Sequence, residues 1–244
     1  MGWNPDELTR ELSEQMKTYI GHVKKWQWIW RRIPFVDAVY LGNSLTFNAL
    51  HEDSDIDLFI VARPWRLWTV RLWTACVFGL LRLKRYRSSK MKFCLSFYVT
   101  GDAANLLPLK KWSVDPYLVY RISHLVQIYH SSDEWLFNIW EENSWISWYL
   151  PNFPLRQVIN IWIEPAEGEA WWKEFAEHWS GWMIGSFFEI LIRTIRLPVV
   201  LRKKRRLWAI WKDIVVSDEI LKFHHDKRRK YSLLWKISSD APEE

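Results

Sequence analysis

Two acidic residues separated by one position form the most distinctive pattern in this sequence of 244 residues. Asp55 and Asp57 open an apolar run, and side chains alternate between the two faces of a strand, so both carboxylates are predicted on one face. Two neighbouring carboxylates repel each other unless a cation lies between them. Mg²⁺ or Mn²⁺ suits such oxygen ligands. We therefore predict that Asp55 and Asp57 are metal ligands and catalytic residues.

A turn lies shortly before the two acids. Gly42, Asn43 and Ser44 follow the apolar segment Phe35–Leu41. Such a turn offers backbone N–H groups and a hydroxyl, which together favour a phosphate. An ordinary helix N-cap by Asn43 or Ser44 would have the same sequence. We predict that Gly42, Asn43 and Ser44 bind the phosphates of a nucleotide, with the N-cap as the alternative.

The order of these segments resembles the nucleotidyltransferase superfamily that includes DNA polymerase beta. Its pattern is a strand, a Gly-Ser turn, a short helix and a strand carrying Asp-x-Asp. The matching segments here are Phe35–Leu41, Gly42–Ser44, Leu45–Leu50 and Asp55–Ala62. The resemblance implies Mg²⁺- or Mn²⁺-dependent transfer of a nucleoside monophosphate from an NTP to a hydroxyl acceptor, which would be a protein, an RNA or a small molecule.

Two features depart from the superfamily pattern. Asn43 separates the Gly and the Ser, which are adjacent in the superfamily. Many active members also carry a third carboxylate on a later strand. The matching segment here, Met91–Thr100, contains no acid, and Ser96 occupies the expected position. Asp102 is the nearest acid and the candidate for a missing general base.

The missing acid keeps two other functions open. A catalytically degenerate relative would bind a nucleotide or a partner protein. An RNA-binding protein would use the basic clusters Arg202–Arg206 and Lys227–Lys230, which otherwise form solvated helix faces. A net charge of +6 and a pI of about 9.2 favour anionic partners in each case.

Strand and helix signals predict an α+β fold in two parts. Residues 1–110 are expected to form a nucleotidyltransferase-like domain, with an N-terminal helix that ends before Pro34 and a mixed sheet. Residues 111–244 are expected to form an α-helical domain. In the first domain, a helix over Trp65–Leu83 is predicted to join the second and third strands. Three arginines of this helix are expected to face solvent: Arg66, Arg71 and Arg82.

Helix signals dominate the second half of the chain. Asp115 is predicted to cap a helix whose apolar face is formed by Leu118, Ile122, Leu125 and Tyr129. Ser217–Glu219 are predicted to cap the last helix. One long helix that ends at Pro198 is predicted before Ser217. It is marked by a run of aromatic residues, which are Trp172, Phe175, Trp179 and Trp182.

The sequence predicts a cytoplasmic protein. Acidic residues stand where a signal peptide would be apolar, and no uncharged apolar stretch approaches the ~20 residues that span a bilayer. The two cysteines, Cys76 and Cys94, lack the spacing of a metal site. They are expected to be buried free thiols in a reducing compartment.

Overall fold

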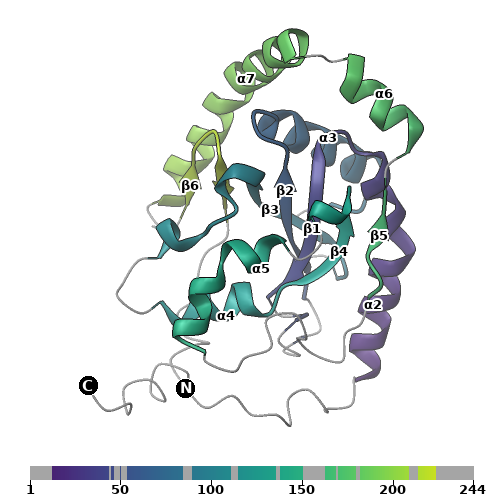
Figure 1. Ribbon diagram of the computed structural model, residues 1–244, viewed down its shortest axis with the longest axis vertical. Coiled ribbons are helices and arrows are strands. Elements are labelled where there is room, and N and C mark those ends of the chain that lie inside the picture. Colours follow the sequence, from purple (N-terminus) through teal and green to yellow (C-terminus); the bar gives the residue numbers. More distant parts are fainter. Residues whose placement is uncertain are drawn as a thin grey trace.

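The computed structural model describes residues 13–43, 45–46, 50, 54–84, 90–110, 115–135, 138–150, 163–168, 170–179, 182–208 and 214–223. A seven-stranded mixed sheet crosses the molecule, and helices lie around it (Figure 1). The strand order is β5-β4-β1-β2-β3-β7-β6. The pairs β2–β3 and β4–β5 are parallel, and the other neighbours are antiparallel. The predicted α+β fold class is confirmed.

The three central strands are those predicted from the sequence: β1 (Val36–Gly42), β2 (Ile56–Ala62) and β3 (Phe93–Thr100). Their registers bring three residues together, because Gly42 pairs with Asp57 across the β1–β2 ladder and Asp57 pairs with Cys94 across the β2–β3 ladder. The end of β1 and the starts of β2 and β3 therefore meet at one edge of the sheet.

The outer strands all come from residues beyond 110: β4 (Val126–His130), β5 (Ala166–Glu167), β6 (Val215–Val216) and β7 (Ile220–Lys222). One sheet thus draws strands from both of the predicted domains, and the division at residue 110 stays a prediction. Tyr129 was expected on a helix face and instead lies in β4. Its spacing from Leu125 fits a helix, but α4 has already ended at Ser123.

The predicted helix cap at Ser217–Glu219 is wrong, because these residues form the turn between β6 and β7. The Ser217 hydroxyl accepts a hydrogen bond from the backbone N–H of Ile220 at 2.8 Å. A serine that caps a helix makes the same local bond to a residue three positions ahead. The sequence signal is therefore shared by the two structures, and the pairing of β7 with β3 decides between them.

Helices from the first half of the chain cover one face of the sheet. α2 (Glu14–Trp26) continues into the 3₁₀ helix η1 (Gln27–Arg32), which ends before Pro34 as predicted. The predicted start of this helix, at Asn4, lies outside the described residues. α3 (Leu67–Leu80) connects the parallel strands β2 and β3. The remaining 3₁₀ helices are η2 (Gly101–Ala103), η3 (Leu107–Leu109), η4 (Asp133–Trp135) and η5 (Ser144–Trp148).

Two of the three arginines expected on the wet side of α3 are not there. The Arg66 side chain is buried and lies over the ring of Phe35, with 5.3 Å between the guanidinium carbon and the ring centroid. Arg71 lies over the ring of Phe223 at 4.3 Å. A guanidinium can stack on an aromatic face, so arginine marks the solvent side of a helix less reliably than lysine does. Arg82 is exposed as predicted.

Four helices come from the second half of the chain: α4 (Pro116–Ser123), α5 (Asn138–Glu142), α6 (Trp171–Trp179) and α7 (Trp182–Trp208). The predicted cap of α4 is confirmed, because the Asp115 carboxylate accepts a hydrogen bond from the N–H of Leu118 at 3.1 Å. The single long helix ending at Pro198 is wrong. Two helices cover that stretch, and Pro198 lies inside α7. A proline removes one helical hydrogen bond, and packing of α7 against α3 holds the helix beyond it.

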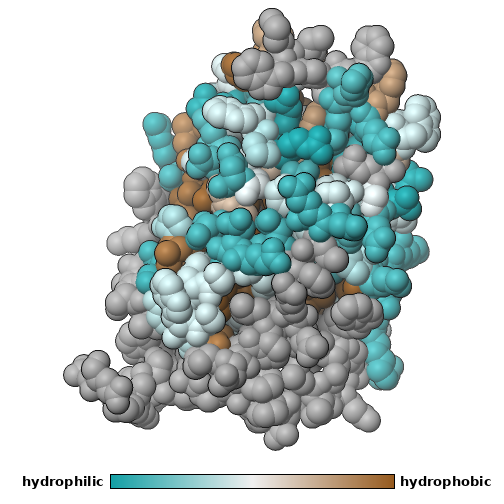
Figure 2. Space-filling model, viewed as in Figure 1, coloured by the Kyte–Doolittle hydropathy of each residue, from teal (hydrophilic) through white to brown (hydrophobic). Residues whose placement is uncertain are grey.

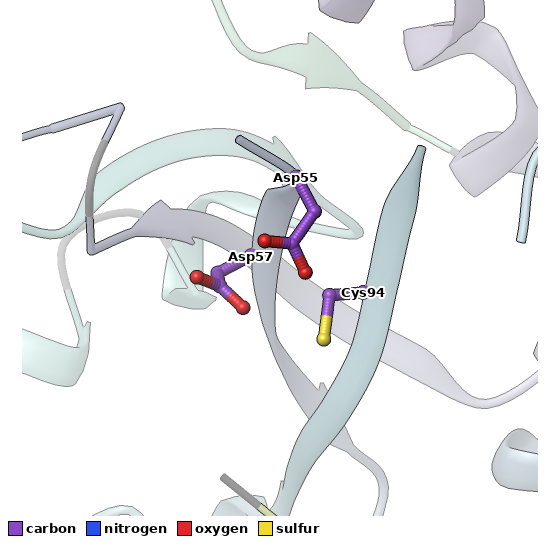
Figure 3. Close-up of side chains that lie close together, drawn as sticks. All are labelled: Asp55, Asp57 and Cys94. Atoms are coloured by element: carbon purple, nitrogen blue, oxygen red, sulfur yellow. The ribbon is translucent and has the colours of Figure 1, made fainter. Parts of the chain in front are cut away.

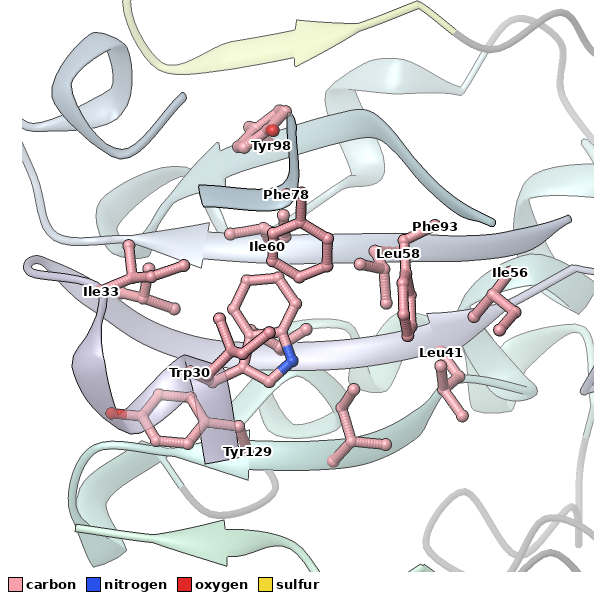
Figure 4. Close-up of a cluster of buried hydrophobic side chains, with 14 of the residues drawn as sticks. Trp30, Ile33, Leu41, Ile56, Leu58, Ile60, Phe78, Phe93, Tyr98 and Tyr129 are labelled. Carbon is pink, nitrogen blue, oxygen red and sulfur yellow. The ribbon is translucent and has the colours of Figure 1, made fainter. Parts of the chain in front are cut away.

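The hydrophobic core lies on both faces of the sheet. On one face, Ile56, Leu58 and Ile60 of β2 pack with Trp30 and Phe78, as Figure 4 shows. On the other face, alternate residues of β2 and β3 pack against α4 and α5: Phe59, Val61, Phe97, Ile122, Ile139 and Trp140. Alternation along β2 places Asp57 on this second face. Among the helices that the structure describes, none has an apolar stretch long enough to cross a bilayer.

Candidate functional site

Asp55 and Asp57 lie at the start of β2 and their carboxylates converge. Ile56 between them is fully buried in the core on the opposite face. Figure 3 shows the side chains of Asp55, Asp57 and Cys94 close together at the edge of the sheet. One ligand atom from each of these three residues lies within 4.8 Å of the other two. Asp57 is buried and Asp55 is half-buried. The two-residue spacing thus produces the predicted geometry.

Asn43 holds one of the two carboxylates. Its side-chain Nδ2 donates a hydrogen bond to Asp57 Oδ2 at 2.8 Å. Asn43 has a φ of 60°, in the left-handed region that asparagine tolerates better than most residues. The residue that interrupts the superfamily's Gly-Ser pair therefore makes the turn and orients the acid. Ser44 lies outside the described residues, as do residues 47–49 of the short helix predicted over Leu45–Leu50.

Gly42 ends β1 directly opposite Asp57. A Cβ atom at this position would lie 3.3 Å from Leu125 Cδ2, which is a tight contact. The glycine therefore permits the segment after α4 to pack closely beside the turn. This packing role is separate from the predicted contact with a phosphate, which stays a prediction for Gly42 and Asn43.

The start of β2 is fixed from two sides. The Tyr19 hydroxyl on α2 donates a hydrogen bond to the backbone oxygen of Ser54 at 2.8 Å. The N–H of Ile56 donates to the backbone oxygen of Lys92 at 2.9 Å. Rigid backbone on both sides of Asp55 limits how far its carboxylate can move. Such support from neighbouring groups is what a metal or phosphate site requires.

Cys94, and not Ser96, is the residue of β3 that pairs with Asp57. Asp57 pairs with Cys94, and an irregularity between Asp57 and Phe59 shifts the register of the following residues. Burial raises the pKa of the Cys94 thiol, and the negative charges of Asp57 and Asp55 raise it further. The thiol is therefore protonated at neutral pH and adds no negative charge. Cys94 is also half-buried, whereas Cys76 is exposed, so the prediction that Cys76 is buried is wrong.

Asp102 does not belong to this group. β2 and β3 run parallel, and Asp57 pairs with Cys94 at one end while Ala62 pairs with Thr100 at the other. Asp102 follows Thr100, in η2. At about 3.3 Å per strand residue, it lies beyond the opposite end of the sheet from the two aspartates. The strand register, which the sequence does not reveal, decides this point.

The donor set fits a divalent cation. Two carboxylates from one strand end supply the oxygen ligands that Mg²⁺ and Mn²⁺ prefer, and Asn43 orients one of them. A protonated thiol is a poor ligand for a hard cation. Asp55 and Asp57 would therefore hold the ion, with the remaining ligands coming from substrate phosphates or water.

A second cluster of charged residues lies at the other end of the β1–β2 pair. Asp37 is 1% exposed. The guanidinium of Arg63 lies 3.4 Å from the Asp37 carboxylate and 2.5 Å from the Glu177 carboxylate. Burial raises the pKa of Asp37 to about 7, although the charges of Arg63 and Lys173 lower it. Asp37 and Arg63 border a cavity of about 480 Å³. A lone acid within an apolar strand forms no motif, so the sequence carries no local signal for Asp37.

Lys173 connects α6 to the same end of the sheet. This fully buried side chain donates hydrogen bonds to the backbone oxygen of Val36 at 3.0 Å and to the hydroxyl of Tyr129 at 2.9 Å. Its ammonium also lies 3.9 Å from Glu177. Cations and anions alternate here, which is the arrangement of a buried ion-pair network that positions a helix.

Only part of the predicted basic surface can be placed. Arg202 and Arg205 are exposed near the C-terminal end of α7, where cations interact favourably with the helix dipole. Lys227–Lys230 lie outside the described residues. Whether the two basic clusters lie together therefore stays a prediction.

Comparison with known proteins adds little to this geometry. No family model matches the chain, and no curated protein matches it. Among solved structures, a chain described as a toxin–antitoxin crystal structure with AMP-PNP is 15% identical. That match covers 54% of this chain and 86% of the other, with a TM-score of 0.27. So low a score does not bear on fold or activity, and functional inference rests on the residues themselves.

Proposed function

We propose that this protein is a Mg²⁺- or Mn²⁺-dependent nucleotidyltransferase, which moves a nucleoside monophosphate from an NTP to a hydroxyl acceptor. The observation that carries the proposal is the convergence of the Asp55 and Asp57 carboxylates at one strand end, with Asn43 bound to Asp57. Placing two acids so close together is costly unless a cation joins them.

The chain's own residues would divide the work as follows. Asp55 and Asp57 would hold the cation, and Asn43 would keep the Asp57 carboxylate in a fixed orientation. Gly42 and Ser44 would contact the phosphates. A bound Mg²⁺ neutralises charge on the triphosphate and on the departing pyrophosphate.

The transfer itself would replace a phosphoanhydride bond of the NTP by a phosphoester bond to the acceptor. The acceptor oxygen forms a bond to the α-phosphorus, while the bond from that phosphorus to the bridging oxygen of the β-phosphate breaks and pyrophosphate leaves. Asp55, the more exposed of the two acids, would take the proton of the acceptor hydroxyl. Phosphoryl-type transfer depends mostly on positioning and charge, so it tolerates the lack of a third acid.

One observation favours a second candidate function. A protonated thiol, that of Cys94, stands beside Asp57 where a third carboxylate would complete a two-metal site. A catalytically degenerate relative would keep the nucleotide and lose the transfer. Such a protein would bind an NTP with its cation as a module for sensing or for recruiting a partner.

Incubation of the full chain with each labelled NTP, Mg²⁺ or Mn²⁺, and a cell extract as the source of acceptor would test the proposal. We expect labelled acceptor with the wild type and none with Asp57→Asn. Asp102→Asn is the matched control, because it removes a carboxylate at the far end of the sheet, and it should keep wild-type activity. NTP binding without labelled acceptor would favour the degenerate relative, and neither binding nor transfer would refute both functions.

A further inference from the structure

A small positively charged pocket lies on the opposite face of the sheet from the aspartates. It has a volume of about 110 Å³ and lies where α3 and α7 meet β3. Three of its lining residues are cations: Arg71, Lys84 and Arg196. Its other described walls are aromatic or aliphatic, and no acid of the described residues lines it. A pocket with cationic groups on apolar walls has the composition of an anion site.

Arg71 is the unusual member of this group. Its guanidinium lies over the rings of Phe223 at 4.3 Å and Tyr98 at 5.6 Å, so two apolar surfaces enclose it. Its Nη1 is buried and has no hydrogen-bond partner among the described residues. Burial lowers the pKa of Arg71, and the charge of Arg196 lowers it further. Arg71 is half-buried as a whole residue, and a guanidinium with a buried nitrogen keeps its charge and requires compensation, which ring stacking supplies only in part.

Two acids close to α3, Glu189 and Asp218, are engaged by other groups. Glu189 of α7 accepts hydrogen bonds from the backbone N–H groups of Trp68 at 2.7 Å and Thr69 at 2.9 Å, at the start of α3. Asp218 pairs with Arg193 at 2.5 Å. Neither acid forms an ion pair with Arg71 or Arg196 within the described part of the chain. Neither Glu189 nor Asp218 therefore compensates the charges of Arg71 and Arg196.

We propose that the pocket between α3 and α7 binds a phosphate group. A guanidinium presents paired N–H donors that match the oxygens of a phosphate, and Arg71, which lines this space, has a buried Nη1 without a partner among the described residues. Lys84 and Arg196 add charge from the two sides. The volume suffices for a compact tetrahedral anion and excludes a whole nucleotide.

The phosphate has two possible sources, a free anion or the headgroup of an acidic lipid. α7 carries exposed apolar side chains beside the pocket, among them Ile195 and Val199, which are 62% and 56% exposed. Figure 2 shows hydrophobic side chains among hydrophilic ones along the edge where α7 runs. Basic and apolar groups mixed on one surface helix also suit a membrane surface. Both sources use the same phosphate chemistry in the pocket.

Calorimetric titration of the full chain with sodium phosphate, at constant ionic strength, tests the pocket. Arg196→Gln should weaken phosphate binding at least tenfold, and Arg202→Gln should not change it, because Arg202 is exposed on the same helix but does not line the pocket. Arg71→Met should abolish binding and raise the melting temperature, since it removes a buried charge without a counterion. Equal losses from Arg196→Gln and Arg202→Gln would overturn the proposal, because they would indicate nonspecific attraction.

A second measurement distinguishes the two sources. The same variants are sedimented with vesicles of phosphatidylcholine alone and with vesicles that also contain phosphatidic acid. Phosphate binding without vesicle binding supports a free anion, and vesicle binding that Arg71→Met and Arg196→Gln abolish supports a lipid headgroup. Absence of both would overturn the proposal. Asp57→Asn should leave all these results unchanged, so the pocket stands or falls independently of nucleotidyl transfer.

Discussion

Asp37 and Asp57 are both buried aspartates on the antiparallel β1–β2 pair, and they lie at its opposite ends. Asp37 contacts the guanidinium of Arg63, in a network that also contains Lys173. Asp57 instead accepts a hydrogen bond from Asn43 and lies beside the carboxylate of Asp55. Burial of an acid therefore does not by itself identify a functional site. The charges that surround the acid distinguish the two cases. Cations surround Asp37, whereas Asp57 lies beside a second carboxylate and is proposed to bind a cation.

The largest expected effect is on the free energy of unfolding, and it comes from removing the ammonium of Lys173 at the Asp37 end of the β1–β2 pair. Lys173→Met leaves the oxygens of Val36 and Tyr129 without their donor and removes charge beside Glu177. Breaking a buried ion pair from one side typically costs about 3–5 kcal/mol of unfolding free energy. Urea denaturation would measure it, with Lys17→Met as control, because Lys17 forms an exposed ion pair. A loss similar to that of the control would show that the network does not stabilise the fold.

The pH dependence of stability should come from Asp37. Its pKa is about 7 in the folded protein and near 3.8 when unfolded, so the folded state holds the proton over a wider range. Stability is then full below about pH 4 and falls as the pH rises toward 7, by at most about 1.4 kcal/mol per pH unit. Asp37→Asn should remove this slope in urea melts at several pH values. An unchanged slope would assign the titration to another group.

Removing the hydrogen bond from Asn43 to Asp57 should have a smaller effect, which we expect in the affinity for metal. Asn43→Gly removes the hydrogen bond to Asp57, and glycine keeps the left-handed backbone that the turn needs. Loss of a group that orients a metal ligand typically costs about 10–100-fold in affinity. Calorimetry with Mn²⁺ would measure this, and Asn105→Gly, at an exposed asparagine elsewhere, should bind as the wild type does. Unchanged affinity would mean that Asn43 does not position the ligand.

The smallest expected effect tests the register of β3. Cys94→Asp would place a third carboxylate beside Asp57, and it should strengthen Mn²⁺ binding about tenfold while lowering stability in the absence of metal. Ser96→Asp should give no gain in affinity, since Cys94 and not Ser96 pairs with Asp57. Calorimetric titration of both variants with Mn²⁺ measures these affinities. A gain from Ser96→Asp alone would show that the third acid belongs where the sequence pattern places it.

The sequence predicts the central strands well, because their signals are local. Alternation along Asp55–Ala62 fixes which side chains share a face, and Pro64 and Pro34 end the neighbouring elements. The same local signals fail where a distant contact decides the outcome. Ser217 makes a cap-like hydrogen bond in a hairpin.

The candidate site is predictable to the same extent. The convergence of Asp55 and Asp57 follows from their spacing, whereas the position of Cys94 depends on how β3 pairs with β2. Arg71 looks like a solvated helix residue in sequence, and its stacking on Phe223 requires a segment about 150 positions away. A single sequence carries no local signal for pairings between segments so far apart.

The most direct test of the proposed active site is calorimetric titration of MgATP and MgGTP into the wild type and into Asp57→Asn. We expect at least one nucleotide to bind the wild type only when Mg²⁺ or Mn²⁺ is present. Asp57→Asn should weaken that binding by at least about 100-fold, since a metal ligand contributes several kcal/mol. The melting temperature of Asp57→Asn should be unchanged or higher than that of the wild type, because the repulsion with Asp55 is relieved. Equal affinity in the two proteins would contradict the assignment of Asp55 and Asp57 as a metal-nucleotide site.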